Sequence, residues 1–124
     1  MTTRIAISVG TDQGLDAPIS PHFGRCPYFA VVEVEGQDIL GVEMVANPYF
    51  PNHEPGQVPA FIHGLNATVM LSGGMGGRAV AFFQQFGIEP ATGAGGTVRE
   101  AVARYLDGGL RGAAACNESV EHGH

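Results

Sequence analysis

A short apolar run, a glycine-rich loop and an amphipathic segment follow one another twice in this 124-residue chain. In the first case TVML leads through SGGMGG into RAVAFFQQF (68–86), and in the second IEPA leads through TGAGG into TVREAVARYL (88–106). Each unit predicts a strand, a loop and a helix, and neighbouring parallel strands require such a helical crossover. Both glycine loops should therefore lie at one edge of a sheet and face a common crevice, where ligands of open α/β sheets bind.

The ends of the two predicted helices have local signals. The apolar residues of the first helix share one face, and Gly87 follows where a left-handed cap is favoured. Thr97 and Glu100 have the spacing of a capping box, so we expect the second helix to start directly after Thr97 and to end at 107–109.

The first half of the chain predicts a different connectivity. A strand at 4–9, which we expect to be buried on both faces, is followed by a punctuated loop at 14–27. Two further strand-like runs, 28–34 and 39–45, are separated by residues 35–38, as in a hairpin. These two strands should be antiparallel neighbours.

A proline-rich stretch connects the two halves. Residues 47–59 contain four prolines and predict an irregular loop. Val58, Phe61, Ile62 and Leu65 then have the i, i+3, i+4, i+7 spacing of one helix face. Together the elements predict an α/β fold with a mixed five-stranded sheet flanked by helices.

Composition limits the class of protein. Hydrophobic residues make up 44% and charged residues 15%, the balance of a compact domain, which we expect to cover 1–110, with 111–124 as a flexible tail. A formal net charge of −6 without a basic stripe argues against nucleic acid as a partner. Without a bilayer-length apolar run or a signal-peptide pattern, we expect a cytoplasmic protein with no membrane contact.

SPHFGRCPYF (20–29) is the segment expected to bind a ligand. His22 and Cys26 lie four residues apart, with Arg25 between them. Imidazole and thiolate both bind soft and borderline metals, and thiolate is the usual ligand of iron–sulfur clusters. The structural alternative is a histidine that caps a turn and a buried cysteine that acts as a small apolar residue.

The glycine loops could bind an anion. Gly74, Gly76 and Ala79 have G-x-G-x-x-A spacing, but the acidic residue of a dinucleotide-binding fold is missing, and no P-loop lysine is present. Glycines at a helix start still let backbone N–H groups approach an anion, and Arg78 would add a charged donor. A tight turn without a ligand is the alternative, and a capped helix is the favoured interpretation of 93–97.

The end of the chain contains several potential metal ligands. Cys116, His122 and His124 fall within nine residues. A flexible tail loses conformational entropy when it closes on a metal, so disorder is the alternative. His53 and Met75 are further candidates whose alternatives are loop and packing roles.

The chain lacks a recognisable catalytic constellation. None of its serines lies in a nucleophile elbow, and paired carboxylates in a predicted cleft are missing. Binding is therefore favoured over catalysis.

Five segments together resemble one family: RIAISVG, SPHFGRCPYF, LSGGMGGRA, GIEPATGAGGTVREAVARYL and the Cys/His tail. The family is that of dinitrogenase iron–molybdenum cofactor biosynthesis, which includes NifX, the C-terminal domain of NifB and NafY. The resemblance extends from Arg4 to Leu110, and HFGR followed by an aromatic strand is its most specific element.

The resemblance implies a ribonuclease H-like α/β fold without ribonuclease chemistry. It also implies a non-catalytic role in binding or carrying the iron–molybdenum cofactor, or a precursor iron–sulfur cluster, with nitrogenase assembly proteins as partners. A related branch, the orange protein of sulfate reducers, holds a mixed molybdenum–copper sulfide cluster, which is an alternative cargo. Two other classes stay open: a regulatory or interaction module without a cluster, and a nucleotide-binding enzyme.

The family's HFG histidine is the expected cluster ligand, and that role falls on His22; some relatives have no thiol where this chain has Cys26. We expect an exposed histidine and cysteine to supply a few direct bonds, while Phe23, Tyr28 and Phe29 pack beneath them. The expected cofactor-binding residues are His22, Phe23, Gly24, Arg25, Cys26, Gly73, Gly74, Met75, Gly76, Gly77, Arg78, Gly95 and Gly96. The expected metal ligands are His22, Cys26, Cys116, His122 and His124.

Overall fold

The computed structural model describes residues 2–23, 25–49 and 56–110. Outside the described residues lie Gly24, His53 and the predicted tail with Cys116, His122 and His124.

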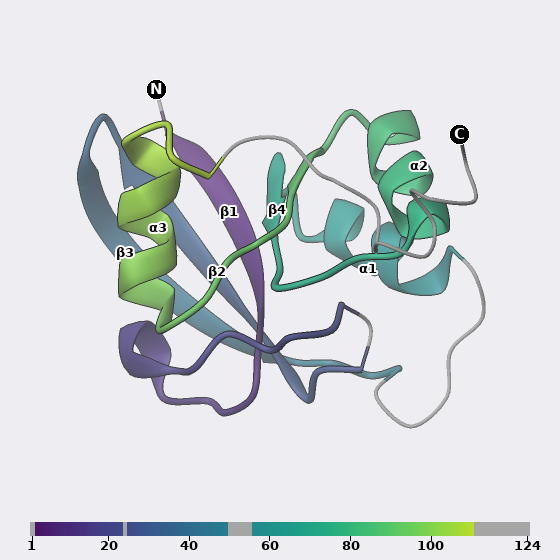
Figure 1. Cartoon of the computed structure of the whole chain (residues 1–124), viewed down its shortest axis with the longest axis horizontal. Coiled ribbons are helices and arrows are strands. Elements are labelled where there is room, and N and C mark those ends of the chain that lie inside the picture. The colour runs from purple at the N-terminus through teal and green to yellow at the C-terminus, as the bar shows by residue number, and fades with distance from the viewer. Residues whose placement is uncertain (1, 24, 50–55, 111–124) are drawn as a thin grey trace.

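A mixed five-stranded sheet forms the centre of the molecule (Figure 1). Its strands are β1 (Thr3–Val9), β2 (Tyr28–Glu35), β3 (Asp38–Ala46), β4 (Val69–Leu71) and β5 (Glu89–Ala91). In the order β3-β2-β1-β4-β5, the first three are antiparallel neighbours, whereas β4 is parallel to both β1 and β5. The predicted α/β fold with a mixed sheet is confirmed, as is the β2–β3 hairpin.

Helices cover both faces of the sheet. α3 (Val98–Leu106) and the short 3-10 helix η1 (Gly14–Asp16) pack on one face, and α1 (Gln57–Gly64) and α2 (Gly77–Gln85) pack on the other (Figure 1). Over the described ranges, none of these helices has the length and apolar character that crossing a bilayer requires.

β1 is buried on both faces, as its apolar sequence predicts. Ile5, Ile7 and Val9 contribute to the core under α3, and Ala6 contributes to the core under α1 and α2. Because β1 is the central strand and runs parallel to β4, the two strands end at the same edge of the sheet.

Two predicted helix ends are confirmed. The Thr97 hydroxyl accepts the N–H of Glu100 at 3.3 Å, and the Glu100 carboxylate accepts the N–H of Thr97 at 2.9 Å, which completes the capping box. Gly87 has φ +74°, the left-handed conformation expected after α2.

Two predicted boundaries are wrong. The loop expected at 47–59 ends earlier, because α1 begins at Gln57 and Pro59 occupies its first turn, where a backbone N–H has no partner within the helix. The hairpin turn is shorter than predicted, because β2 and β3 each extend one residue further into it. Gly36, at the first position of this turn, has φ +62°, which glycine adopts without strain.

Candidate functional site

Three loops meet at the carboxyl edge of β1, β4 and β5. The segment after β1 contains His22, and the glycine loops follow β4 and β5. Gly93 N–H donates to the Gly73 carbonyl at 3.2 Å, and Ala94 N–H donates to the Ser72 carbonyl at 3.1 Å. The prediction that both glycine loops lie at one edge is confirmed.

The His22 segment lies directly on the first glycine loop. Gly73 N–H donates to the Ser20 carbonyl at 3.2 Å, and Phe23 N–H donates to the Gly74 carbonyl at 3.0 Å. The two bonds flank His22 in the sequence, so its backbone is held against the glycine loop on both sides. The sequence did not predict this pairing.

Gly73 and Gly74 are required by the close approach of the two segments. A Cβ at Gly73 would lie 2.8 Å from Pro21 Cα and 2.9 Å from the Ser20 carbonyl oxygen, and a Cβ at Gly74 would lie 3.0 Å from the Pro21 carbonyl oxygen. Backbone atoms held in a loop cannot move aside as a flexible side chain can. Gly73 thus has a packing role, and its N–H is already used within the protein, where the sequence suggested an amide open to an anion.

The side chain of His22 is exposed above this junction. Ser20, itself buried, closes a small turn beneath it: its Oγ accepts the His22 N–H at 3.3 Å and donates to the His22 carbonyl at 3.0 Å. The backbone of His22 is therefore fixed while its imidazole is accessible. An accessible imidazole can bind a metal through a ring nitrogen.

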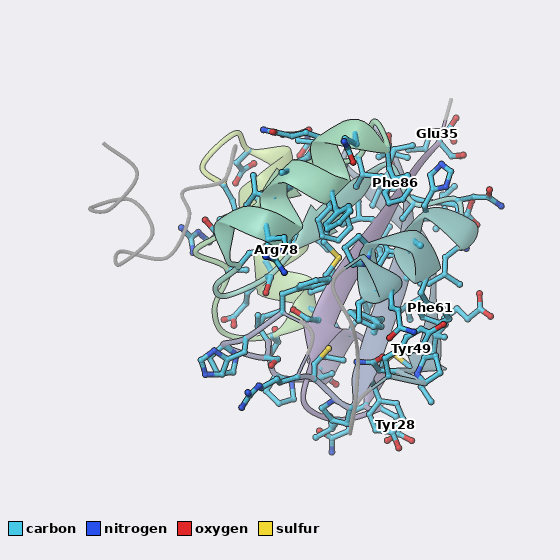
Figure 2. The ribbon with its side chains drawn as sticks, turned by 90° about the vertical axis from the view of Figure 1, so that its right-hand side faces the viewer. Tyr28, Glu35, Tyr49, Phe61, Arg78 and Phe86 are labelled. Atoms are coloured by element: carbon cyan, nitrogen blue, oxygen red, sulfur yellow. The ribbon has the colours of Figure 1, made fainter. Side chains whose placement is uncertain are left out.

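Two exposed arginines lie close in the sequence to these loops. Arg25 follows His22 in the first segment, and Arg78 is the second residue of α2. Figure 2 shows Arg78 and Phe86 at opposite ends of α2. The unpaired amides at the start of α2 carry partial positive charge, so this end of the helix adds to the positive potential of the guanidinium groups.

Cys26 and Met75 are buried, so the expectation of an exposed Cys26 is wrong. Their exposed fractions are 0% and 2%. Both belong to the core under α1 and α2, together with Phe29 and Phe83. In this position the thiol packs as a small apolar group, which was the structural alternative.

Asn47, which no sequence motif singled out, holds the Cys26 end of the segment. Its buried side-chain amide donates to the Cys26 carbonyl at 2.8 Å, and its Oδ1 accepts the N–H of Tyr49 at 2.9 Å. Its backbone N–H donates to the Pro27 carbonyl at 2.9 Å. Asn47 therefore ties the chain entering β2 to the chain leaving β3.

Phe23 anchors the middle of the segment in the core. Its ring lies edge-on to Phe83, with centroids 5.1 Å apart, and its centroid is 6.3 Å from that of Phe29. A second aromatic contact, between Tyr49 and Phe61 at 6.2 Å, extends the same core beside α1 (Figure 2). The predicted packing role of Phe23 and Phe29 is confirmed, whereas Tyr28 packs against the core under α3 on the other face of the sheet.

The second glycine loop mainly serves the start of α3. The Gly96 carbonyl accepts the N–H of Ile19 at 2.9 Å, and Gly96 has φ +76°. A Cβ at Gly96 would collide with the Glu100 carboxylate of the capping box. Gly95 is exposed and has open space around it. The favoured interpretation of this loop, a capped helix, agrees with these contacts.

Ser8 and Ser72 form a buried hydroxyl pair beneath the loops, which the sequence did not predict. Their Oγ atoms are 2.9 Å apart. The available signal was a hydroxyl in a strand predicted to be buried on both faces, because a buried hydroxyl needs a hydrogen-bond partner.

Among the residues that the structure describes, no three His, Cys, Asp or Glu side chains are grouped closely enough to hold a metal ion. Cys116, His122, His124 and Gly24 lie outside those residues. The ligand roles of His22 and Cys26 stay predictions, and of the two side chains His22 is the exposed one.

The model of the family described as "Dinitrogenase iron-molybdenum cofactor" matches residues 3–108, which include all three loops of the site. The chain belongs to this family. A relative, the uncharacterized protein MJ0580 of Methanocaldococcus jannaschii, is 31% identical over 96 residues, which are 74% of this chain and 80% of that protein.

Solved structures share the fold of this family member. The crystal structure of PH0822 matches with a TM-score of 0.78 at 36% identity, and the match covers 88% of this chain and 95% of the PH0822 chain. The apo form of the orange protein from Desulfovibrio gigas matches with a TM-score of 0.79 at 32% identity, and the match covers 91% of this chain and 94% of the orange protein chain. The family resemblance inferred from the sequence is thereby confirmed.

Proposed function

We propose that the chain binds the iron–molybdenum cofactor, or a precursor iron–sulfur cluster, around His22 at the loop edge, which is the carboxyl edge of β1, β4 and β5 where the three loops meet. It would carry this cargo during nitrogenase cofactor assembly without catalysing a reaction. Membership of the family supports the class of cargo. The observation that carries the proposal is an exposed imidazole on a segment whose backbone is hydrogen bonded on both sides of it.

The charges near the loops support an anionic cargo. The whole chain has a formal net charge of −6, so a negatively charged cluster needs local compensation. Positive charge comes from Arg25, Arg78 and the first amides of α2. None of these groups has to bind the metal directly to compensate the charge of the cluster. Arg25 is three residues after His22, and α2 begins three residues after Gly74, whose carbonyl accepts the N–H of Phe23, so we expect these groups near a cluster bound by His22.

A small number of direct bonds suits a carrier. With Cys26 in the core, the segment contributes His22 as an accessible ligand, and the remaining contacts would come from guanidinium and amide N–H groups. Few direct bonds leave the cargo free to be transferred to nitrogenase assembly proteins, which are the expected partners of a cytoplasmic carrier.

Two alternatives have their own support. A mixed molybdenum–copper sulfide cluster is an alternative cargo, because the fold matches that of the orange protein closely. A regulatory or interaction module without a cluster is an alternative function, because the buried Cys26 removes one expected ligand from the surface.

The experiment is anaerobic incubation of the purified protein with extracted iron–molybdenum cofactor, followed by gel filtration, visible spectroscopy and metal analysis. The wild type should elute as a coloured complex, and His22→Ala should weaken binding at least about tenfold, the loss expected for a directly bound group worth about 1.4 kcal/mol. His63→Ala is the matched control, because His63 is also exposed but lies in α1 and stacks on Phe86 with centroids 4.8 Å apart.

The outcomes separate the hypotheses. If His22→Ala binds as tightly as the wild type, the site assignment is wrong. If the wild type retains neither this cofactor nor, in parallel incubations, a precursor iron–sulfur cluster or a molybdenum–copper sulfide cluster, the carrier proposal fails and the interaction module is favoured.

A further inference from the structure

The two buried serines lie at the base of the loop edge. Ser8 belongs to β1 and Ser72 follows β4, and both have an exposed fraction of 0%. Ser8 Oγ donates to Ser72 Oγ at 2.9 Å, and Ser72 Oγ donates to the Gly74 carbonyl at 2.9 Å. A chain of hydroxyl hydrogen bonds thus runs from the central strand to the first glycine loop.

The Gly74 carbonyl is the junction of two hydrogen bonds. It accepts one from Ser72 Oγ and one from Phe23 N–H, and these occupy the two lone pairs of a carbonyl oxygen. Ser8 is also connected to the other side of His22, because its carbonyl accepts the N–H of Ser20 at 2.9 Å. Ser8 is therefore connected to both flanks of His22: its backbone carbonyl bonds Ser20 directly, and its hydroxyl is linked to Phe23 through Ser72 and the Gly74 carbonyl.

We infer that Ser8 and Ser72 are positioning residues that orient the Gly74 peptide and thereby hold His22 at a set place relative to the start of α2. Neither side chain reaches the surface, so neither would touch a cargo. Two apolar side chains of similar size could fill the same space, and such a double replacement is often nearly neutral for stability. We therefore attribute the hydroxyl pair to its effect on the geometry of the first glycine loop rather than to a gain in folding stability. Its consequence for cargo binding rests on the proposed function.

Single and double variants separate the two roles. Ser72→Ala leaves the Ser8 hydroxyl buried without its acceptor and should raise the unfolding equilibrium constant about 5- to 30-fold. Combining it with Ser8→Ala removes both hydroxyls and should recover most of that loss. The double variant therefore keeps its stability but lacks the hydroxyl donor to the Gly74 carbonyl, which is left with the Phe23 N–H alone.

Amide hydrogen exchange of the protein without cargo, followed residue by residue by NMR, is the positioning test. In the double variant the amides of Phe23 and Gly73 should exchange at least about tenfold faster, while those of the β2–β3 hairpin should keep their wild-type rates. Tyr105→Phe is the control: it removes a hydrogen bond of 2.7 Å to Glu89 on the α3 side and should leave Phe23 exchange unchanged. Unchanged Phe23 and Gly73 exchange in the double variant would overturn the inference.

Cofactor binding then tests the consequence. The double variant should bind extracted cofactor about tenfold more weakly than the wild type, although it remains folded. Equal binding by a wild type and a double variant that both hold the cofactor would refute the link between positioning and cargo. If the wild type binds no cluster, the proposed function fails, whereas the exchange result still decides the positioning role.

Discussion

Gly73→Ala tests whether close backbone packing creates the loop edge. The added Cβ would lie 2.8 Å from Pro21 Cα and 2.9 Å from the Ser20 carbonyl oxygen, closer than real Cβ contacts allow. The backbone of Gly73 is not in the left-handed region, so alanine can adopt its conformation and the cost is steric. The His22 segment and the glycine loop must separate to accommodate the methyl group.

The magnitude follows from two contributions. Overpacking of a tight site costs about 1–3 kcal/mol. Separation of the segments also weakens the Gly73–Ser20 and Phe23–Gly74 backbone hydrogen bonds, each worth about 0.5–1.5 kcal/mol. We therefore expect Gly73→Ala to lower the free energy of unfolding by about 2–6 kcal/mol, a large part of the total for a domain of this size.

Urea denaturation followed by circular dichroism measures this loss, with the slope of the transition checked for two-state behaviour. Gly95→Ala is the matched control, because Gly95 lies in the neighbouring loop, is not left-handed and has no atom within 4 Å of the place that an added Cβ would occupy. It should be neutral or gain up to about 1 kcal/mol. If Gly73→Ala is as stable as Gly95→Ala, close packing of the two segments is not what requires glycine at 73.

Three further changes test other parts of the site. Asn47→Ala should lower the free energy of unfolding by about 1–3 kcal/mol in urea denaturation, because the Cys26 carbonyl loses a buried donor. A loss below about 0.5 kcal/mol would show that Asn47 does not stabilise the junction between β2 and β3. Thr97→Ala should cost about 0.5–2 kcal/mol in the same assay by removing the acceptor for the Glu100 N–H, and an unchanged midpoint would show that the capping box is not stabilising. In a Cys116→Ser background, Cys26 should resist a thiol reagent in the native protein and react fully after unfolding, because its thiol is buried; rapid native labelling would place it at the surface.

Local sequence patterns determined most of the elements of this protein. The short apolar runs, the helical spacing of apolar residues, the Thr97–Glu100 spacing and Gly87 act over a few residues, so their consequences could be predicted without knowledge of the rest of the chain. The start of α1 was misplaced because proline was interpreted as a loop signal, although the first turn of a helix tolerates it. Even the meeting of the two glycine loops was predictable, because parallel strands end at the same edge.

Only the tertiary structure decided where the residues of the site lie and what they contact. Gly73 could be assigned to packing only once Pro21 and Ser20 were seen against it, more than 50 positions away in the sequence. The sequence made both His22 and Cys26 ligand candidates, with His22 as the first, and the fold exposed His22 and buried Cys26. The Ser8–Ser72 pair spans 64 positions. Such contacts depend on which strands are neighbours and how closely their loops approach, and no local pattern encodes either distance.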